Sequence, residues 1–103
     1  MEILQIQLYI DEHIFEQIQL FELAEMANLS ESRFKVRFKK EVGIPPSQYI
    51  SRKKIEKSQQ MLASGQYSVT EVALKLGFAS SQYFSTVFKR YVGSPPSSVT
   101  ATC

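Results

Sequence analysis

The second half of this chain repeats a motif from its first half. Residues 34–47 read FKVRFKKEVGIPPS, and residues 84–97, which lie 50 positions later, read FSTVFKRYVGSPPS. Eight positions are identical, among them two phenylalanines, a glycine and two consecutive prolines. Two copies are too few for a stacked solenoid. The repeat instead predicts a small protein that presents one structural unit twice.

Size and composition allow a packed core and argue against several other classes. With 103 residues, 44% of them hydrophobic, the chain can form one compact domain or two small lobes that share a core. No apolar run approaches the length of a membrane span, and the start does not resemble a signal peptide. Cys103 is the single cysteine, which excludes a disulfide within the chain. We therefore expect a cytoplasmic protein without a membrane partner.

Charge is distributed unevenly, although the net charge is only +2. Residues 1–30 carry six acids and neither lysine nor arginine. Residues 31–57 carry nine lysine and arginine residues and three glutamates. Such a basic segment indicates a polyanionic partner, and the alternative is an ordinary solvated helical face. Because these charges lie partly inside the repeated motif, the polyanion interpretation is favoured.

Helical periodicity accounts for the first half of the chain. A helix is expected over about 3–16, with five residues available for burial: Leu4, Leu8, Ile10, Ile14 and Phe15. A short helix over 20–27 follows. The next helix, expected from an N-cap at Ser30 to Val42, has a buried stripe of Phe34, Phe38 and Val42.

The second half predicts a similar series. Pro46 suits the first position of a long helix that runs to about Ala63. Residues 68–71 form a capping-box pattern that opens a helix through Leu76. A helix capped by Ser80 and ending before Gly93 comes next, and a last short helix is expected from Pro95. The fold class is therefore all-α.

Each repeat contains a short helix, a tight turn and a second helix, which is a helix-turn-helix. Small residues, Ala24 and Ala73, stand where the two helices cross, and Asn28 and Gly77 suit the turns. We expect a first lobe over 1–45, a linking helix over 46–64 and a second lobe over 65–103. The linking helix would be about 27 Å long over residues 46–63. The second helix of a helix-turn-helix, the recognition helix, fits the major groove of DNA, and here these helices are expected over about 31–42 and 81–92. Successive major grooves on one face of DNA lie about 34 Å apart, so two recognition helices held near this spacing would enter adjacent grooves.

These motifs resemble the DNA-binding domain of the AraC/XylS family of bacterial transcription regulators. The resemblance spans nearly the whole chain, and its most specific part is the segment 77–89, which reads GFASSQYFSTVFK. It implies seven helices, arranged as two homeodomain-like lobes joined by a linking helix. In the family this domain usually follows a ligand-binding or receiver domain. The chain is therefore interpreted as a fragment of a longer regulator or as a short stand-alone member.

The groove-facing side of each second helix lies opposite its phenylalanines. The residues expected to contact bases are Ser32, Lys35, Val36, Gln82, Ser85 and Thr86. Lys35 suits guanine, Gln82 suits adenine, and Val36 and the Thr86 methyl group suit a thymine methyl. The residues expected to meet phosphates, directly or through nearby backbone N–H groups, are Ser30, Arg33, Lys39, Lys40, Arg52, Lys53, Ser80, Tyr83, Lys89 and Arg90.

The alternative to DNA binding is a helical protein-interaction module that contacts RNA polymerase or an absent sensor domain. An enzyme is not expected, because the chain has one histidine, a single terminal cysteine and no phosphate-cradling glycine loop. The same residues predict no cofactor and no metal site.

Overall fold

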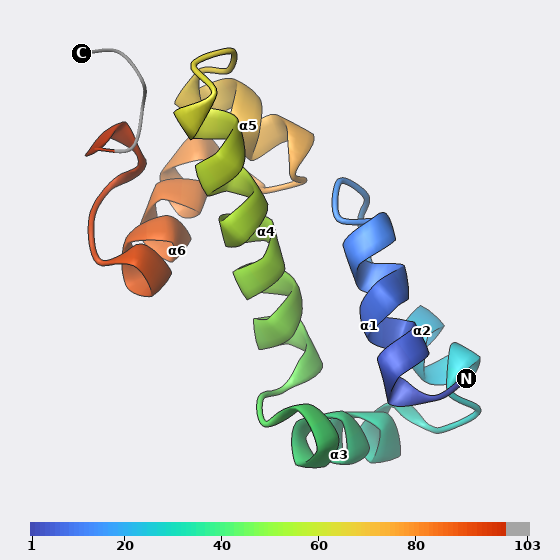
Figure 1. Ribbon diagram of the computed structural model, residues 1–103. Coiled ribbons are helices and arrows are strands. Elements are labelled where there is room, and N and C mark those ends of the chain that lie inside the picture. The colour runs from blue at the N-terminus through green and yellow to red at the C-terminus, as the bar shows by residue number, and fades with distance from the viewer. Residues whose placement is uncertain (99–103) are drawn as a thin grey trace. The chain divides into compact units, whose positions relative to one another are not determined.

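The computed structural model describes residues 1–98, and within that range every regular element is a helix (Figure 1). The helices, in chain order, are α1 (Ile3–Glu12), α2 (Leu20–Met26), α3 (Glu31–Val42), α4 (Pro46–Ala63), α5 (Val69–Lys75), α6 (Ser81–Val92) and the 3-10 helix η1 (Pro96–Ser98). The all-α class is confirmed. The prediction of seven helices was wrong in detail: residues 1–98 form six α-helices, and the described part of the last helix, expected from Pro95, is the single 3-10 turn η1. The rest of that expected helix lies outside the described residues. No helix among the described residues combines the length and apolarity that crossing a membrane requires.

The chain divides into two compact units, the first comprising Met1–Ser51 and the second beginning at Arg52. The first contains α1, α2, α3 and the start of α4. The second contains the rest of α4, then α5, α6 and η1. Each unit has a core of its own, and each contains one copy of the repeated motif.

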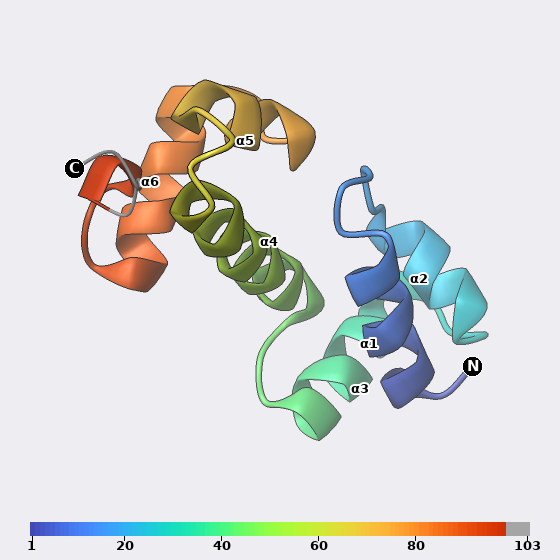
Figure 2. The same ribbon diagram turned by 45° about the horizontal axis from the view of Figure 1, so that its top comes forward.

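The first unit is built around the phenylalanines of α3. Phe34 and Phe38 are fully buried, and the rings of Phe38 and of Tyr49 from α4 form a T-shaped pair with a centroid distance of 5.5 Å. Helix α1 covers them, and α2 contributes Leu23 and Ala24 to the same cluster (Figures 1 and 2). The four-residue spacing of the phenylalanines therefore fixes which face of α3 turns inward.

The expectation for the first helix was partly wrong. Helix α1 ends at Glu12, and Leu4, Leu8 and Phe15 are exposed. The buried stripe consists instead of Ile3, Ile6, Ile10 and, beyond the helix, Ile14. Two apolar stripes are available on this segment, and only one can face α2 and α3. The helix stops where the His13 ring stacks on Tyr9 and donates from Nδ1 to the Tyr9 carbonyl at 2.9 Å.

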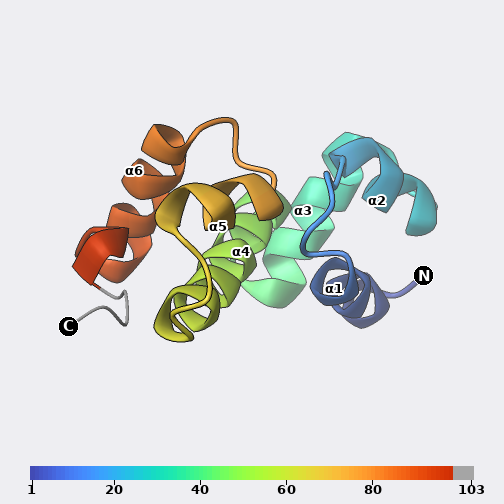
Figure 3. The same ribbon diagram turned by 90° about the horizontal axis from the view of Figure 1, so that it is seen from above.

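The second unit repeats this plan. Phe84 and Phe88 of α6 are fully buried, as the spacing predicts. They pack with Val72 and Ala73 of α5 and with three residues of α4: Ile55, Met61 and Leu62. Ser58 is completely buried in α4, and its hydroxyl donates to the Ile55 carbonyl at 2.6 Å, so its polar atom is satisfied. Figure 3 shows the turn by which the chain leaves α5 and enters α6.

Candidate nucleic-acid interface

The turn that joins the two helices has the same bonding in both units. Asn28 takes φ 59° and Gly77 takes φ 78°, the left-handed conformation that asparagine and glycine tolerate best. In the first unit the N–H of Leu29 donates to the Ala24 carbonyl at 3.0 Å. In the second, the N–H of Phe78 donates to the Ala73 carbonyl, also at 3.0 Å. The predicted helix-turn-helix geometry is therefore present twice.

The helices that follow the turns begin and end alike. The Ser30 hydroxyl accepts the N–H of Arg33, and the Ser80 hydroxyl accepts the N–H of Tyr83. Gly43 and Gly93 end α3 and α6 with φ of 100° and 92°. An N-cap serine fixes the first turn of a helix, and a left-handed glycine ends it. The bounds of α3 and α6 therefore follow from residues whose roles the sequence predicts.

The face of α3 opposite its phenylalanines is exposed and polar, apart from one apolar side chain. Ser32, Lys35 and Val36 all lie on the surface. Val36 is 69% exposed, so its methyl groups are open to solvent. Arg37, for which no DNA contact is predicted from the sequence, is also exposed and bonds through Nε to Glu41 at 2.9 Å. This pair links successive turns of α3.

The corresponding face of α6 carries few charges. Gln82 and Thr86 are exposed, and Ser85 is half-buried. The Thr86 hydroxyl donates to the Gln82 carbonyl at 3.1 Å, so its proton is engaged within the helix. Tyr83 is exposed, and its ring lies 6.1 Å from that of Phe78 in the preceding turn.

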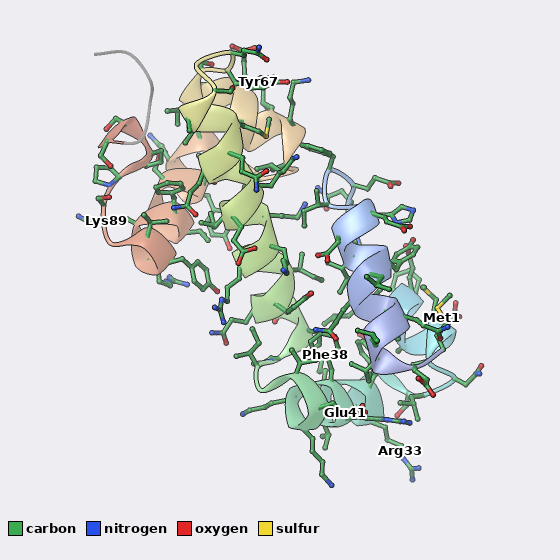
Figure 4. The ribbon with its side chains drawn as sticks, viewed as in Figure 1. Met1, Arg33, Phe38, Glu41, Tyr67 and Lys89 are labelled. Carbon is green, nitrogen blue, oxygen red and sulfur yellow. The ribbon has the colours of Figure 1, made fainter. Side chains whose placement is uncertain are left out.

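Several of the basic residues predicted to contact phosphates lie on the surface of each unit. Arg33, Lys39, Lys40, Arg52, Lys89 and Arg90 are all exposed. Figure 4 shows Arg33 extending away from α3 and Lys89 extending away from α6. Lys53 is more enclosed and lies 3.6 Å from the Glu56 carboxylate. Each unit therefore carries its own cationic side chains close to its recognition helix.

Two units of this kind define the class of the chain, a tandem helix-turn-helix protein. A family model described as "Helix-turn-helix domain" matches residues 23–102, and the chain belongs to that family. The probable transcriptional regulator LumQ of Photobacterium leiognathi is 38% identical over 88 residues, which is 85% of this chain and 36% of that protein. The transcriptional activator RhaS of Salmonella schwarzengrund is 33% identical over 86 residues, which is 84% of this chain and 31% of that protein. The chain thus spans about a third of the length of these curated relatives.

Solved structures share the fold. The DNA-binding domain of AdpA, crystallised with a target DNA, has a TM-score of 0.87 and 31% identity, with 93% of this chain and 86% of that chain covered. The C-terminal domain of the response regulator yesN from Fusobacterium nucleatum has a TM-score of 0.85 and 33% identity, covering 92% and 93% of the two chains. An AraC-type DNA-binding protein from Chromobacterium violaceum shares the fold with a TM-score of 0.88 at 21% identity, covering 96% and 88%. The resemblance to the AraC-type domains is confirmed.

Proposed function

We propose that this chain binds double-stranded DNA in a sequence-specific manner and serves as the DNA-binding part of a bacterial transcription regulator. The observation that carries the proposal is the duplicated helix-turn-helix, with the same turn bond and the same serine cap in both units. Helices α3 and α6 are the recognition helices, each of which enters a major groove with its polar face toward the bases. The two grooves are adjacent along the duplex.

The first recognition helix supplies most of the electrostatic attraction. Helix α3 carries five basic residues, whereas α6 carries only Lys89 and Arg90. Phosphate contacts made by lysine and arginine release counterions, so the affinity falls as salt rises. Lys35 reads guanine from α3, and the exposed methyl groups of Val36 meet a thymine methyl. The proposal includes the division into a first lobe over 1–45, a linking helix over 46–64 and a second lobe over 65–103. It also includes a cytoplasmic location.

The second recognition helix reads bases mainly with uncharged groups. Its exposed Gln82 amide matches the N6 and N7 edge of adenine, which takes a bidentate pair of hydrogen bonds. Because the Thr86 hydroxyl proton is held by the Gln82 carbonyl, the methyl group is the part of Thr86 suited to the groove. An apolar contact with a thymine methyl follows from that arrangement.

Replacing Gln82 by alanine tests the adenine contact. We expect Gln82→Ala to lose about 1–3 kcal/mol of binding free energy on the preferred site and to relax specificity at one base pair. The measurement is a competition titration against duplexes that vary one position at a time. Equal weakening on every sequence would remove Gln82 from the set of base readers.

A pair of substitutions separates the methyl group of Thr86 from its hydroxyl. Thr86→Val keeps the methyl and removes the hydroxyl, whereas Thr86→Ser does the opposite. We expect the valine variant to retain the preference for thymine at its position. The serine variant should lose part of it, about tenfold or less, since one apolar contact contributes modestly. The opposite order of the two variants in the same titration would assign the contact to the hydroxyl.

A second candidate function rests on the exposed stripe of α1. Leu4 and Leu8 are 65% and 54% exposed and lie one turn apart in the acidic segment of the chain. Such a face suits a protein partner, for which RNA polymerase or a sensor or receiver domain of the longer regulator are the candidates. If protein interaction were the only function, the chain would show no salt-dependent affinity for DNA and would be retained in pull-downs by its partner.

A further inference from the structure

Lys54 of the second unit does not have the environment of an ordinary surface lysine. It lies in α4, within the basic run of residues 52–57, and it is half-buried. Its Nζ donates to the Leu76 carbonyl at 2.6 Å, a contact between residues 22 positions apart. Desolvation by burial lowers the pKa of Lys54 below its ordinary value. The side chain is therefore directed into the unit and toward one backbone oxygen.

That oxygen stands at the C-terminus of α5. Leu76 is the C-cap of α5, where carbonyl groups have no partner within the helix and the helix dipole is negative. An ammonium group bonded there stabilises the end of the helix. The next residue, Gly77, takes the left-handed conformation that turns the chain toward α6. Lys54 thus holds the first peptide of the turn.

This turn also contacts the second recognition helix. The N–H of Phe78 donates to the Ala73 carbonyl, and the Phe78 ring lies 5.0 Å from that of buried Phe84. Ser80 then caps α6. A displacement of the Leu76 carbonyl would therefore be transmitted through the turn to the start of α6.

We infer that Lys54 is a positioning residue, which holds the turn between α5 and α6 and so sets where Gln82 and Thr86 meet DNA. The inference rests on the proposed function, since base reading by α6 is its readout. Lys54 therefore has a different role from its neighbours Arg52 and Lys53, which are proposed to contact phosphates. Lys54 sets base selectivity through α6 and does not add to the salt-dependent attraction.

The test compares Lys54→Met with Lys54→Arg and with a control, Lys75→Met. Lys75 belongs to α5, and its Nζ lies 5.8 Å from the centre of the Tyr67 ring, so the control removes the same charge from the same unit. At temperatures well below melting, we expect Lys54→Met to lose about tenfold in discrimination at the base pairs read by α6. Its salt slope should match that of the unchanged protein, whereas loss of one phosphate contact would flatten the slope by about 1. Lys54→Arg should recover discrimination, and Lys75→Met should not lose it.

Amide hydrogen exchange gives a readout that needs no DNA. The N–H groups of Gly77 and Phe78 donate to Leu74 and Ala73, and we expect both to exchange about tenfold faster in Lys54→Met and not in Lys75→Met. Unchanged exchange and unchanged discrimination in folded Lys54→Met would overturn the inference. So would a shallower salt slope with discrimination intact. If Lys54→Met does not fold, Lys54→Gln decides in the same two assays. Absence of selectivity in the unchanged protein itself would instead count against the proposed function, and the exchange result would still test the turn.

Discussion

Replacing Phe84 by alanine is expected to lower the free energy of unfolding of the second unit by about 3–5 kcal/mol. Phe84 is fully buried and packs against the rings of Phe78 and Phe88, at centroid distances of 5.0 and 5.7 Å. Its removal deletes apolar contacts on both sides and leaves a cavity between α5 and α6. The measurement is denaturant unfolding followed by amide signals of residues in both units, so that each substitution is read in the unit that contains it.

Phe21→Ala is the matched control for that experiment. Phe21 is 53% exposed on α2, so the same substitution should change stability by less than about 1 kcal/mol. An effect at Phe84 no larger than the effect at Phe21 would mean that the α6 phenylalanines do not form the core of the second unit.

Removing the cations of the first recognition helix should produce the largest change in DNA binding. We expect the triple variant Arg33→Ala, Lys39→Ala and Lys40→Ala to flatten the slope of log affinity against log salt by about 3, because each substitution removes one phosphate partner. All three residues are exposed, and they lie close to the repeated serine cap or in the last turn of α3. Titrations at several salt concentrations measure the slope.

The three substitutions should act in nearly equal steps when they are introduced one at a time. Lys75→Ala serves as the control, since Lys75 is exposed on α5 and has no assigned contact with DNA. If Lys75→Ala flattened the slope as much as Lys39→Ala, the basic residues would attract DNA through their overall charge and not through specific phosphate contacts. A loss of discrimination at one base pair in Lys39→Ala would place that lysine among the base readers.

Local signals in the sequence predicted the helix-turn-helix units closely. Ser30 and Ser80 cap their helices, Gly43 and Gly93 end them, and Pro46 begins α4, as expected. Each of these residues acts within about one turn of its own position, so its effect does not depend on distant parts of the chain. The phenylalanine spacing likewise determined the buried face, because no competing apolar stripe exists on α3.

Choices that depend on tertiary packing could not be predicted in the same way. The segment that forms α1 offers two apolar stripes, and only the presence of α2 and α3 selects Ile3, Ile6 and Ile10 over Leu4 and Leu8. The environment of Lys54 could not be foreseen, because a lysine inside a basic run looks like a solvated one. Its partner, the Leu76 carbonyl, is distant in sequence and is a backbone atom that carries no residue-specific signal.

Selection from random duplexes tests the central claim most directly. The chain is mixed with a random duplex pool at several salt concentrations, binding is followed by fluorescence anisotropy, and the bound fraction is sequenced. We predict a steep salt dependence and an enriched motif with two blocks about one helical turn apart, one for each recognition helix. A steep salt dependence without a motif would contradict base reading by α3 and α6. Absence of binding at low salt would contradict DNA binding by this chain and favour the protein-interaction module.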